Sequence, residues 1–284
     1  MHYIKKFHSW LDDRKIQFGE FEYWSSRSRG ANHAFYAEGK YDLPVVVILH
    51  STGCDKYTPL IEIYKMLLES GYSVFSFDLD GHGRDSTHVL DRENILAGGA
   101  SEIINEAITA AKEKLKFEKI ILLGQSLGGC IAMEYCLQLA PLHKIEKLVC
   151  IGSPLRLDLA RVSIKKELSS AGQPSVLRAL KTYGFAGIIP ALGSFRRNVW
   201  PIRCIGGKQV KYLPEIVGII NGLKLQDRSK DIDVPTVWVA GGWDSIAQGA
   251  PRMKNLIVID VPHECHFSLL YCDNYLVELR NLIK

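Results

Sequence analysis

The chain has 284 residues, of which 47% are hydrophobic and 23% are charged, as in an ordinary globular protein. A net charge of +4 is too small to indicate a nucleic-acid partner, and no apolar run approaches the roughly 20 residues of a membrane span. The seven cysteines are scattered, without a Cys-x-x-Cys pair, which favours a reduced, cytoplasmic protein without disulfides.

Strands and helices alternate along most of the chain. Two aromatic-rich segments, Phe18–Trp24 and Ala34–Glu38, predict a hairpin at a sheet edge. Further strands are predicted over Val45–Leu49, Tyr72–Phe77, Ile120–Leu123, Leu148–Ile151, Pro235–Ala240 and Leu256–Ile259. Helices are predicted over Pro59–Ser70, Ser101–Lys116, about Gly129–Leu139, and Phe267–Ile283 at the end of the chain. This pattern predicts an α/β fold with a mostly parallel central sheet covered by helices on both faces.

The alternation stops between residues 154 and 231. Helices are predicted there over Leu155–Ser169, Pro174–Tyr183 and Glu215–Leu225, joined by an apolar, glycine-rich link, and no buried strand is evident. We interpret 154–231 as a helical cap inserted into a core made of 1–153 and 232–284. Such a cap would lie over the carboxyl edge of the sheet, where open α/β sheets carry their sites.

The strongest motif is Gly124-Gln125-Ser126-Leu127-Gly128. It lies between a predicted strand and a predicted helix, the context that a Gly-x-Ser-x-Gly pattern requires. The glycines allow the strand and the helix to approach closely, and the turn exposes the Ser126 hydroxyl at a helix N-terminus. Ser126 is therefore the candidate nucleophile.

A serine nucleophile needs a base within hydrogen-bond reach and an acid that orients the base. His266 follows the last predicted strand and is preferred to His263, because the loop needs length to reach back over the sheet. Asp244 directly follows the strand Pro235–Ala240 and is preferred to Asp260. A metal site at His263 and His266 is disfavoured, because no other Cys/His pair has ligand spacing.

In chain order, Ser126, Asp244 and His266 have the order found in α/β-hydrolases. The sequence resembles that superfamily, in particular its cap-bearing esterases, lipases and thioesterases, over about 43–153 and 232–284. The motifs that carry the resemblance are Gly124–Gly128, Asp78–Arg84, Gly242–Asp244 and Cys265–Phe267. The turn Gly81-His82-Gly83 resembles one that is usually structural, so His82 is not assigned to catalysis.

The resemblance implies an oxyanion hole made of two backbone N–H groups. One belongs to Leu127, the residue after the nucleophile, and the other to the loop His50–Gly53. By position the second donor is Thr52, with Ser51 as the alternative, because His50-Ser51 stands where many relatives have His-Gly. Cys265 replaces a glycine that many relatives have before the histidine.

These residues predict a serine hydrolase that cleaves a carboxylic ester or thioester through an acyl-enzyme on Ser126, without a metal or an organic cofactor. An acyltransferase with the same three residues differs only in the group that accepts the acyl chain. A catalytically silent binding protein on the same fold is the third alternative.

The predicted cap suggests what the substrate looks like. Its apolar residues could line an acyl pocket, or could only pack the cap on the core; they are Phe185, Ile188, Ile189, Leu192 and Phe195. Residues 154–231 hold 14 Lys and Arg against 5 Asp and Glu. This charge indicates either a solvated basic surface or recognition of an acyl group on an anionic carrier.

Overall fold

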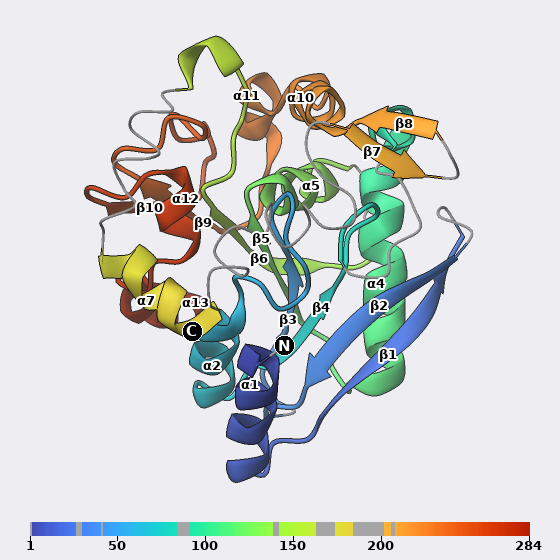
Figure 1. Ribbon diagram of the computed structural model, residues 1–284, viewed down its shortest axis with the longest axis vertical. Coiled ribbons are helices and arrows are strands. Elements are labelled where there is room, and N and C mark those ends of the chain that lie inside the picture. Colours follow the sequence, from blue (N-terminus) through green and yellow to red (C-terminus); the bar gives the residue numbers. More distant parts are fainter. Residues whose placement is uncertain are drawn as a thin grey trace.

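The computed structural model describes residues 2–26, 30–40, 42–83, 91–138, 142–162, 174–183, 202–205 and 208–284. Eight strands form the central sheet: β1 (Phe18–Ser25), β2 (Gly30–Ala37), β3 (Val45–Leu49), β4 (Ser73–Phe77), β5 (Ile120–Gln125), β6 (Ile145–Ile151), β9 (Thr236–Gly241) and β10 (Leu256–Val261). Their order across the sheet is β1-β2-β4-β3-β5-β6-β9-β10. The hairpin β1–β2 is antiparallel and joins β4 antiparallel, whereas the remaining neighbours are parallel (Figure 1).

Helices lie on both faces of this sheet (Figure 1). In the first half they are α1 (His2–Asp13), α2 (Ile61–Glu69), α3 (Arg92–Asn94), the π-helix η1 (Ile95–Gly99), α4 (Ala100–Lys114) and α5 (Leu127–Cys136). In the second half they are η2 (Leu159–Arg161), α7 (Pro174–Tyr183), α10 (Tyr212–Gly222), α11 (Leu225–Arg228), η4 (Ser229–Asp231), α12 (His266–Leu270) and α13 (Leu276–Ile283). A separate hairpin pairs β7 (Ile202–Ile205) with β8 (Lys208–Lys211).

The period of two along the strands divides the core into two layers. In β3, Val45, Val47 and Leu49 pack in the same cluster as the buried sides of α4, α5 and α10. The alternate residues Val46 and Ile48 pack with α1, α2 and α13 on the other face. Successive side chains of a strand point to opposite faces, so a continuous apolar run is what a doubly covered strand needs. The predicted fold class is confirmed.

The predicted closing helix is wrong in one respect. Phe267–Ile283 is not continuous, because α12 ends at Leu270 and α13 begins only at Leu276. Between them, Cys272 and Tyr275 are buried in the core, and Leu276 donates its N–H to the carbonyl of Asp273. The turn-forming Asp-Asn pair at 273–274 breaks the helix where two side chains must turn inward.

The prediction for 155–169 is also wrong over its described part. Up to Val162 the chain contains only the short η2, because Asp158 caps the N–H of Ala160 and starts the helical turn late. Leu157 is fixed before that by two hydrogen bonds with the Asn221 amide, of 2.9 and 3.0 Å. The hairpin β7–β8 was not predicted, since neither strand has an apolar alternation that stands out.

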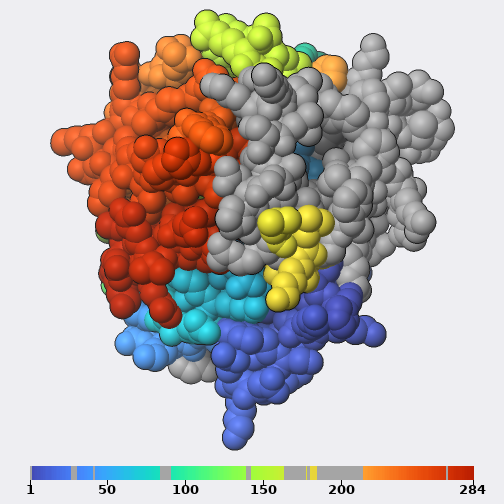
Figure 2. All heavy atoms as spheres, turned by 60° about the vertical axis from the view of Figure 1, so that its left-hand side comes forward, coloured from blue at the N-terminus to red at the C-terminus, as the bar shows by residue number. Residues whose placement is uncertain are grey.

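The described parts of the segment 154–231 pack against both layers of the core. Ile219 and Ile220 of α10 belong to the cluster that contains α4 and α5. On the opposite face Tyr183 of α7 donates to the carbonyl of Pro59 at 3.0 Å and contacts the Tyr3 ring edge-on. Figure 2 shows α7 in yellow at the surface, next to the N-terminal segment in blue. Helices α7 and α10 therefore fix this segment at two distant points.

Of the helices in the described part of the chain, none combines the length and the apolar character needed to cross a bilayer.

Candidate active site

Ser126 lies in the tight turn between β5 and α5. Its φ of 49° and ψ of −117° are unusual for a residue with a side chain, and such strain persists only where the surroundings enforce it. A Cβ on Gly124 would lie 2.4 Å from the Cα of Gly129, and one on Gly128 would lie 2.4 Å from the Leu49 carbonyl oxygen. The glycines of the motif are therefore needed for close packing around the turn, as the sequence predicts.

The structure brings Ser126, His266 and Asp244 together at the carboxyl ends of the parallel strands. The Ser126 Oγ lies 3.1 Å from the Nε2 of His266, and the His266 Nδ1 lies 3.0 Å from the Oδ2 of Asp244. All three residues are buried, with 6, 9 and 7% of their surface exposed for Ser126, His266 and Asp244. A histidine whose Nδ1–H donates to the carboxylate has an Nε2 that can accept the serine proton.

Asp244 uses its two carboxylate oxygens for different purposes. Oδ1 accepts the backbone N–H groups of Ile246 at 2.8 Å and Ala247 at 2.7 Å, while Oδ2 faces His266. Burial raises the pKa of Asp244, but His266 and the two backbone donors outweigh that effect, so the pKa lies below its ordinary value. The carboxylate is thus ionised at neutral pH and fixed in orientation.

The two alternative residues, His263 and Asp260, are both exposed, whereas Ser126, His266 and Asp244 are buried. His263 is exposed, has a positive φ of 66°, and packs edge-on against the Trp243 ring with centroids 4.8 Å apart. Asp260, the last residue but one of β10, is also exposed. His266 is the first residue of α12, and this position turns its ring toward the serine.

The loop after β3 lies next to the serine turn, because β3 pairs with β5 and Gly128 packs on the backbone of Leu49 and His50. Thr52 is half-buried in this loop, whereas Leu127 is fully buried at the start of α5. Among the described residues, neither of their N–H groups donates a loop or turn hydrogen bond. Ser51 is buried, with its Oγ 2.8 Å from the Sγ of Cys54.

His50 ties the same loop to the segment after β4. Its Nε2 accepts the N–H of Leu79 at 2.9 Å, so its Nδ1 donates to the carbonyl of Ser51 at 2.8 Å. Burial is the main reason that the pKa of His50 lies below its ordinary value. The His82 ring lies 5.1 Å from the His50 ring, and His82 is buried, which agrees with a structural role for that turn.

The sequence analysis did not predict the buried ion pair between Lys56 and Asp78. The Lys56 Nζ lies 3.2 Å from the Oδ2 of Asp78, and the Lys56 backbone N–H donates to Oδ1 at 2.7 Å. Burial raises the pKa of Asp78 in spite of the lysine. A Cβ on Gly83 would lie 2.4 Å from the Asp78 Oδ2, so the glycine leaves room for the carboxylate. Asp78 marks the start of the loop motif, but nothing in the sequence connects it with Lys56.

The sequence analysis also missed two backbone features near Asp244, because each depends on contacts that no sequence motif shows. The N–H groups of Ile246 and Ala247 that hold Asp244 are backbone groups, which no side-chain pattern reveals. Gly152 has a φ of 53°, which favours glycine, and a Cβ there would lie 3.2 Å from the Cδ2 of Leu269 in α12. Its role arises only when β6, β9 and α12 come together.

The acyl-pocket residues Phe185, Ile188 and Leu192, together with Ile189 and Phe195, lie outside the described residues. Within the described part of the chain, no group of three or more His, Cys, Asp or Glu side chains is arranged to hold a metal ion. Six thiols there are free, and burial raises the pKa of Cys54, near the serine turn, to about 12. That thiol stays protonated at neutral pH and is a poor nucleophile.

Comparison with known proteins agrees with this fold. Residues 44–173 match the family described as alpha/beta hydrolase fold. A Pyrococcus furiosus esterase, Pf2001, superimposes with a TM-score of 0.59 and 14% identity, over 95% of this chain and 90% of the esterase. This chain has the α/β-hydrolase fold.

Other solved structures resemble this chain to a similar degree. The 2-hydroxy-6-oxo-6-phenylhexa-2,4-dienoate hydrolase of Rhodococcus sp. strain RHA1 has a TM-score of 0.58 and 16% identity, over 93% of this chain and 97% of its own. The monoacylglycerol lipase of Paleococcus ferrophilus has a TM-score of 0.56 and 16% identity, over 94% of this chain and 98% of its own. At such low identity these likenesses concern the fold.

In sequence, this chain is 33% identical over 99 residues to rat and mouse proteins named 1-acylglycerol-3-phosphate O-acyltransferase ABHD5. The aligned stretch spans 33% of this chain and 26% of those relatives.

Proposed function

We propose that this protein is a serine hydrolase that cleaves a carboxylic ester or thioester through an acyl-enzyme on Ser126. The observation that carries the proposal is the hydrogen-bonded series from the Ser126 Oγ through His266 to Asp244, at 3.1 and 3.0 Å. Such a series is what a serine hydroxyl needs to become a nucleophile at neutral pH.

In the proposed reaction, Ser126 attacks the carbonyl carbon while the His266 Nε2 accepts its proton. The ionised Asp244 holds the Nδ1–H side of the ring and stabilises the imidazolium that forms. The N–H groups of Leu127 and Thr52 stabilise the oxyanion of the tetrahedral intermediate. His266 then protonates the leaving alcohol or thiol, and a water molecule repeats the sequence on the acyl-enzyme.

The segment 154–231 acts in this proposal as a cap over the site, with Phe185, Ile188 and Leu192 in contact with the acyl chain. Its described parts support a cap that is fixed at two points, since α7 packs beside α1 and α10 packs on α5. A panel of esters with a common alcohol and acyl chains from acetyl to medium length tests the pocket. Equal rates across the panel would rule out an apolar acyl pocket.

An acyltransferase is the second candidate. The partial similarity to proteins named 1-acylglycerol-3-phosphate O-acyltransferase favours it. In that case an alcohol replaces water in the second half of the reaction, while the same three side chains act. Product analysis with an added alcohol separates the two, because a transferase forms the new ester in preference to the free acid.

A fluorophosphonate probe gives the most direct test of the nucleophile. We expect covalent labelling of Ser126 in the wild-type protein and none in Ser126→Ala, with the labelled peptide identified by mass spectrometry. Absence of labelling in a folded wild-type protein would favour the catalytically silent alternative.

A further inference from the structure

A polar cavity of about 510 Å³ lies beside the loop that follows Asp244. Three separate parts of the chain line it: the segment after β6, the helices α11 and η4, and the loop 245–252. Four of the lining side chains are cationic and two are carboxylates; they are Arg156, Arg161, Lys230, Arg252, Asp158 and Asp227. In Figure 1 this region is the end of the molecule where η2, in yellow-green, lies near α11, in orange.

Three of the four cationic side chains form no ion pair with the described protein, and the lining has two more cations than carboxylates. Asp158 pairs with Arg161 at 3.3 Å, within one turn of chain. Arg156, Lys230 and Arg252 take part in none of the ion pairs found between described residues. By contrast, the neighbouring Arg228 of α11 forms a bidentate ion pair with Glu134, at 2.7 and 3.2 Å.

The cationic groups converge because of the tertiary structure alone. Arg156, Lys230 and Arg252 come from the three different segments, and Gln226 and Gln248 add amide groups to the same wall. Arginine forks match the oxygens of a phosphate in pairs, and a lysine adds a compact charge. A cavity with these donors suits a dianionic group better than a neutral or cationic one.

We propose that this cavity binds the phosphate group of a small organic molecule. The proposal rests in part on the proposed function, because one of the two possible sources of the phosphate is the substrate of Ser126. It belongs either to the substrate itself, whose ester or thioester bond then reaches Ser126, or to a separate phosphorylated compound that regulates the enzyme.

The cavity is connected with the active site through the loop after Asp244. Ile246 lines the cavity, and its N–H is one of the two donors that hold the Asp244 Oδ1. Farther along the same loop, the Arg252 N–H donates to the Ser229 Oγ at 3.3 Å, and this hydrogen bond joins the loop to η4. A phosphate held between Arg156 and Arg252 would therefore steady the loop that orients the acid.

The first test is calorimetric titration with inorganic phosphate at constant ionic strength. We expect saturable binding to the wild-type protein, with a dissociation constant about tenfold or more higher in Arg156→Gln and in Arg252→Gln, as expected for loss of a charge-assisted hydrogen bond. Both arginines are exposed, so the variants should fold.

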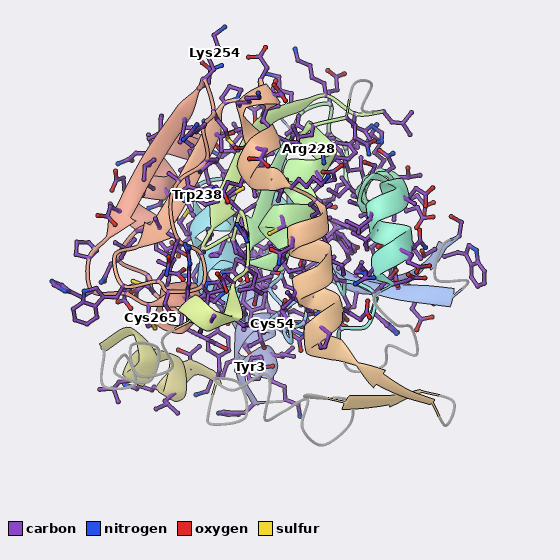
Figure 3. The ribbon with its side chains drawn as sticks, turned by 90° about the horizontal axis from the view of Figure 1, so that it is seen from above. Tyr3, Cys54, Arg228, Trp238, Lys254 and Cys265 are labelled. Atoms are coloured by element: carbon purple, nitrogen blue, oxygen red, sulfur yellow. The ribbon has the colours of Figure 1, made fainter. Side chains whose placement is uncertain are left out.

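Lys254→Gln is the matched control. It removes a positive charge two residues from Arg252, but Lys254 does not line the cavity, and Figure 3 shows its side chain pointing outward from the molecule. Its affinity for phosphate should equal that of the wild type. No saturable binding, or an equal loss in all three variants, would overturn the site. Ser126→Ala should bind phosphate as the wild type does, so failure of the proposed function would not be mistaken for failure of this proposal.

Kinetics then distinguish the two sources. If the phosphate belongs to the substrate, Arg252→Gln should lower kcat/KM about tenfold more for an ester that carries a phosphate on its alcohol than for a neutral ester of the same acyl chain. If it belongs to a separate compound, inorganic phosphate should change turnover of the neutral ester in the wild type and not in Arg252→Gln. Phosphate binding with neither effect would overturn the connection with the active site.

Discussion

The Nε2 of His266 lies 3.1 Å from the Oγ of Ser126, although the two residues are 140 positions apart in the chain. The contact depends on two local features of the backbone. The turn with φ 49° presents Ser126 above the sheet, and the first position of α12 presents His266 to it. Asp244 completes the arrangement from the end of β9, one strand nearer the edge than β6.

If the three residues act as one unit, their losses will not add. Ser126→Ala and His266→Ala should each lower kcat on the order of 10⁴- to 10⁶-fold, and the double variant should be little worse than either. Steady-state kinetics with an activated ester measures this. His263→Ala is the control, and we expect it to keep most of the activity, since His263 is exposed and packs on Trp243. Full activity in His266→Ala would move the base elsewhere.

Asp244→Asn should affect both turnover and the pH dependence of stability. The amide keeps the oxygen that accepts the two backbone N–H groups, but its NH2 cannot accept the His266 Nδ1–H, so kcat should fall on the order of 10³- to 10⁴-fold. The folded-state pKa of Asp244 lies below its ordinary value. The stability that its charge contributes is therefore fully present above the unfolded-state pKa of about 3.9 and is lost as the pH falls through the lower folded-state pKa.

Urea unfolding at a series of pH values checks the second effect. The difference in free energy of unfolding between wild type and Asp244→Asn should be constant near neutrality and shrink below about pH 4. A difference that instead grew toward low pH would contradict the direction of the pKa shift.

The buried pair Lys56–Asp78 should matter more than exposed pairs. Lys56→Met leaves the Asp78 carboxylate buried without its cation, which typically costs about 3–5 kcal/mol. Lys65→Met is a suitable comparison, because its pair with Glu62 is partly exposed, and we expect a loss of less than about 1 kcal/mol. Chemical denaturation of both variants measures the two losses.

A second substitution separates charge from packing at this site. Adding Asp78→Asn to Lys56→Met removes the unpaired charge, so the double variant should be more stable than Lys56→Met alone. If it is less stable, the lysine acts mainly through the packing of its side chain.

Glycine at position 128 should be indispensable for close packing. Gly128→Ala places a Cβ 2.4 Å from the Leu49 carbonyl oxygen, and we expect a loss of about 1–3 kcal/mol in stability, as for overpacked cores. Gly242→Ala places its Cβ no closer than 3.5 Å to its neighbours, so its stability should stay within about 0.5 kcal/mol of the wild type. Thermal unfolding compares the two, and equal effects would contradict the steric explanation.

The sequence by itself determined the fold class and the approximate positions of most strands along the chain. These features depend on local periodicity: the run Val45–Leu49 is apolar at every position because helices cover both faces of β3. The glycines and the serine of residues 124–128 are likewise a local pattern, since a tight turn between strand and helix needs them in sequence. Ser126, Asp244 and His266 could be singled out as candidates because each lies in the turn or loop that follows a strand.

Tertiary structure alone decided what depends on contacts between distant segments. The Asp-Asn pair at 273–274 permits a break between α12 and α13, but the burial of Cys272 and Tyr275 on either side of it is a tertiary feature. The pairing of Lys56 with Asp78, the backbone donors to Asp244 and the cavity of Arg156, Lys230 and Arg252 each join residues from different strands and loops. Electrostatic and hydrogen-bonding interactions act over a few ångströms in space, so a sequence shows which charges are present, and only the fold shows which of them meet.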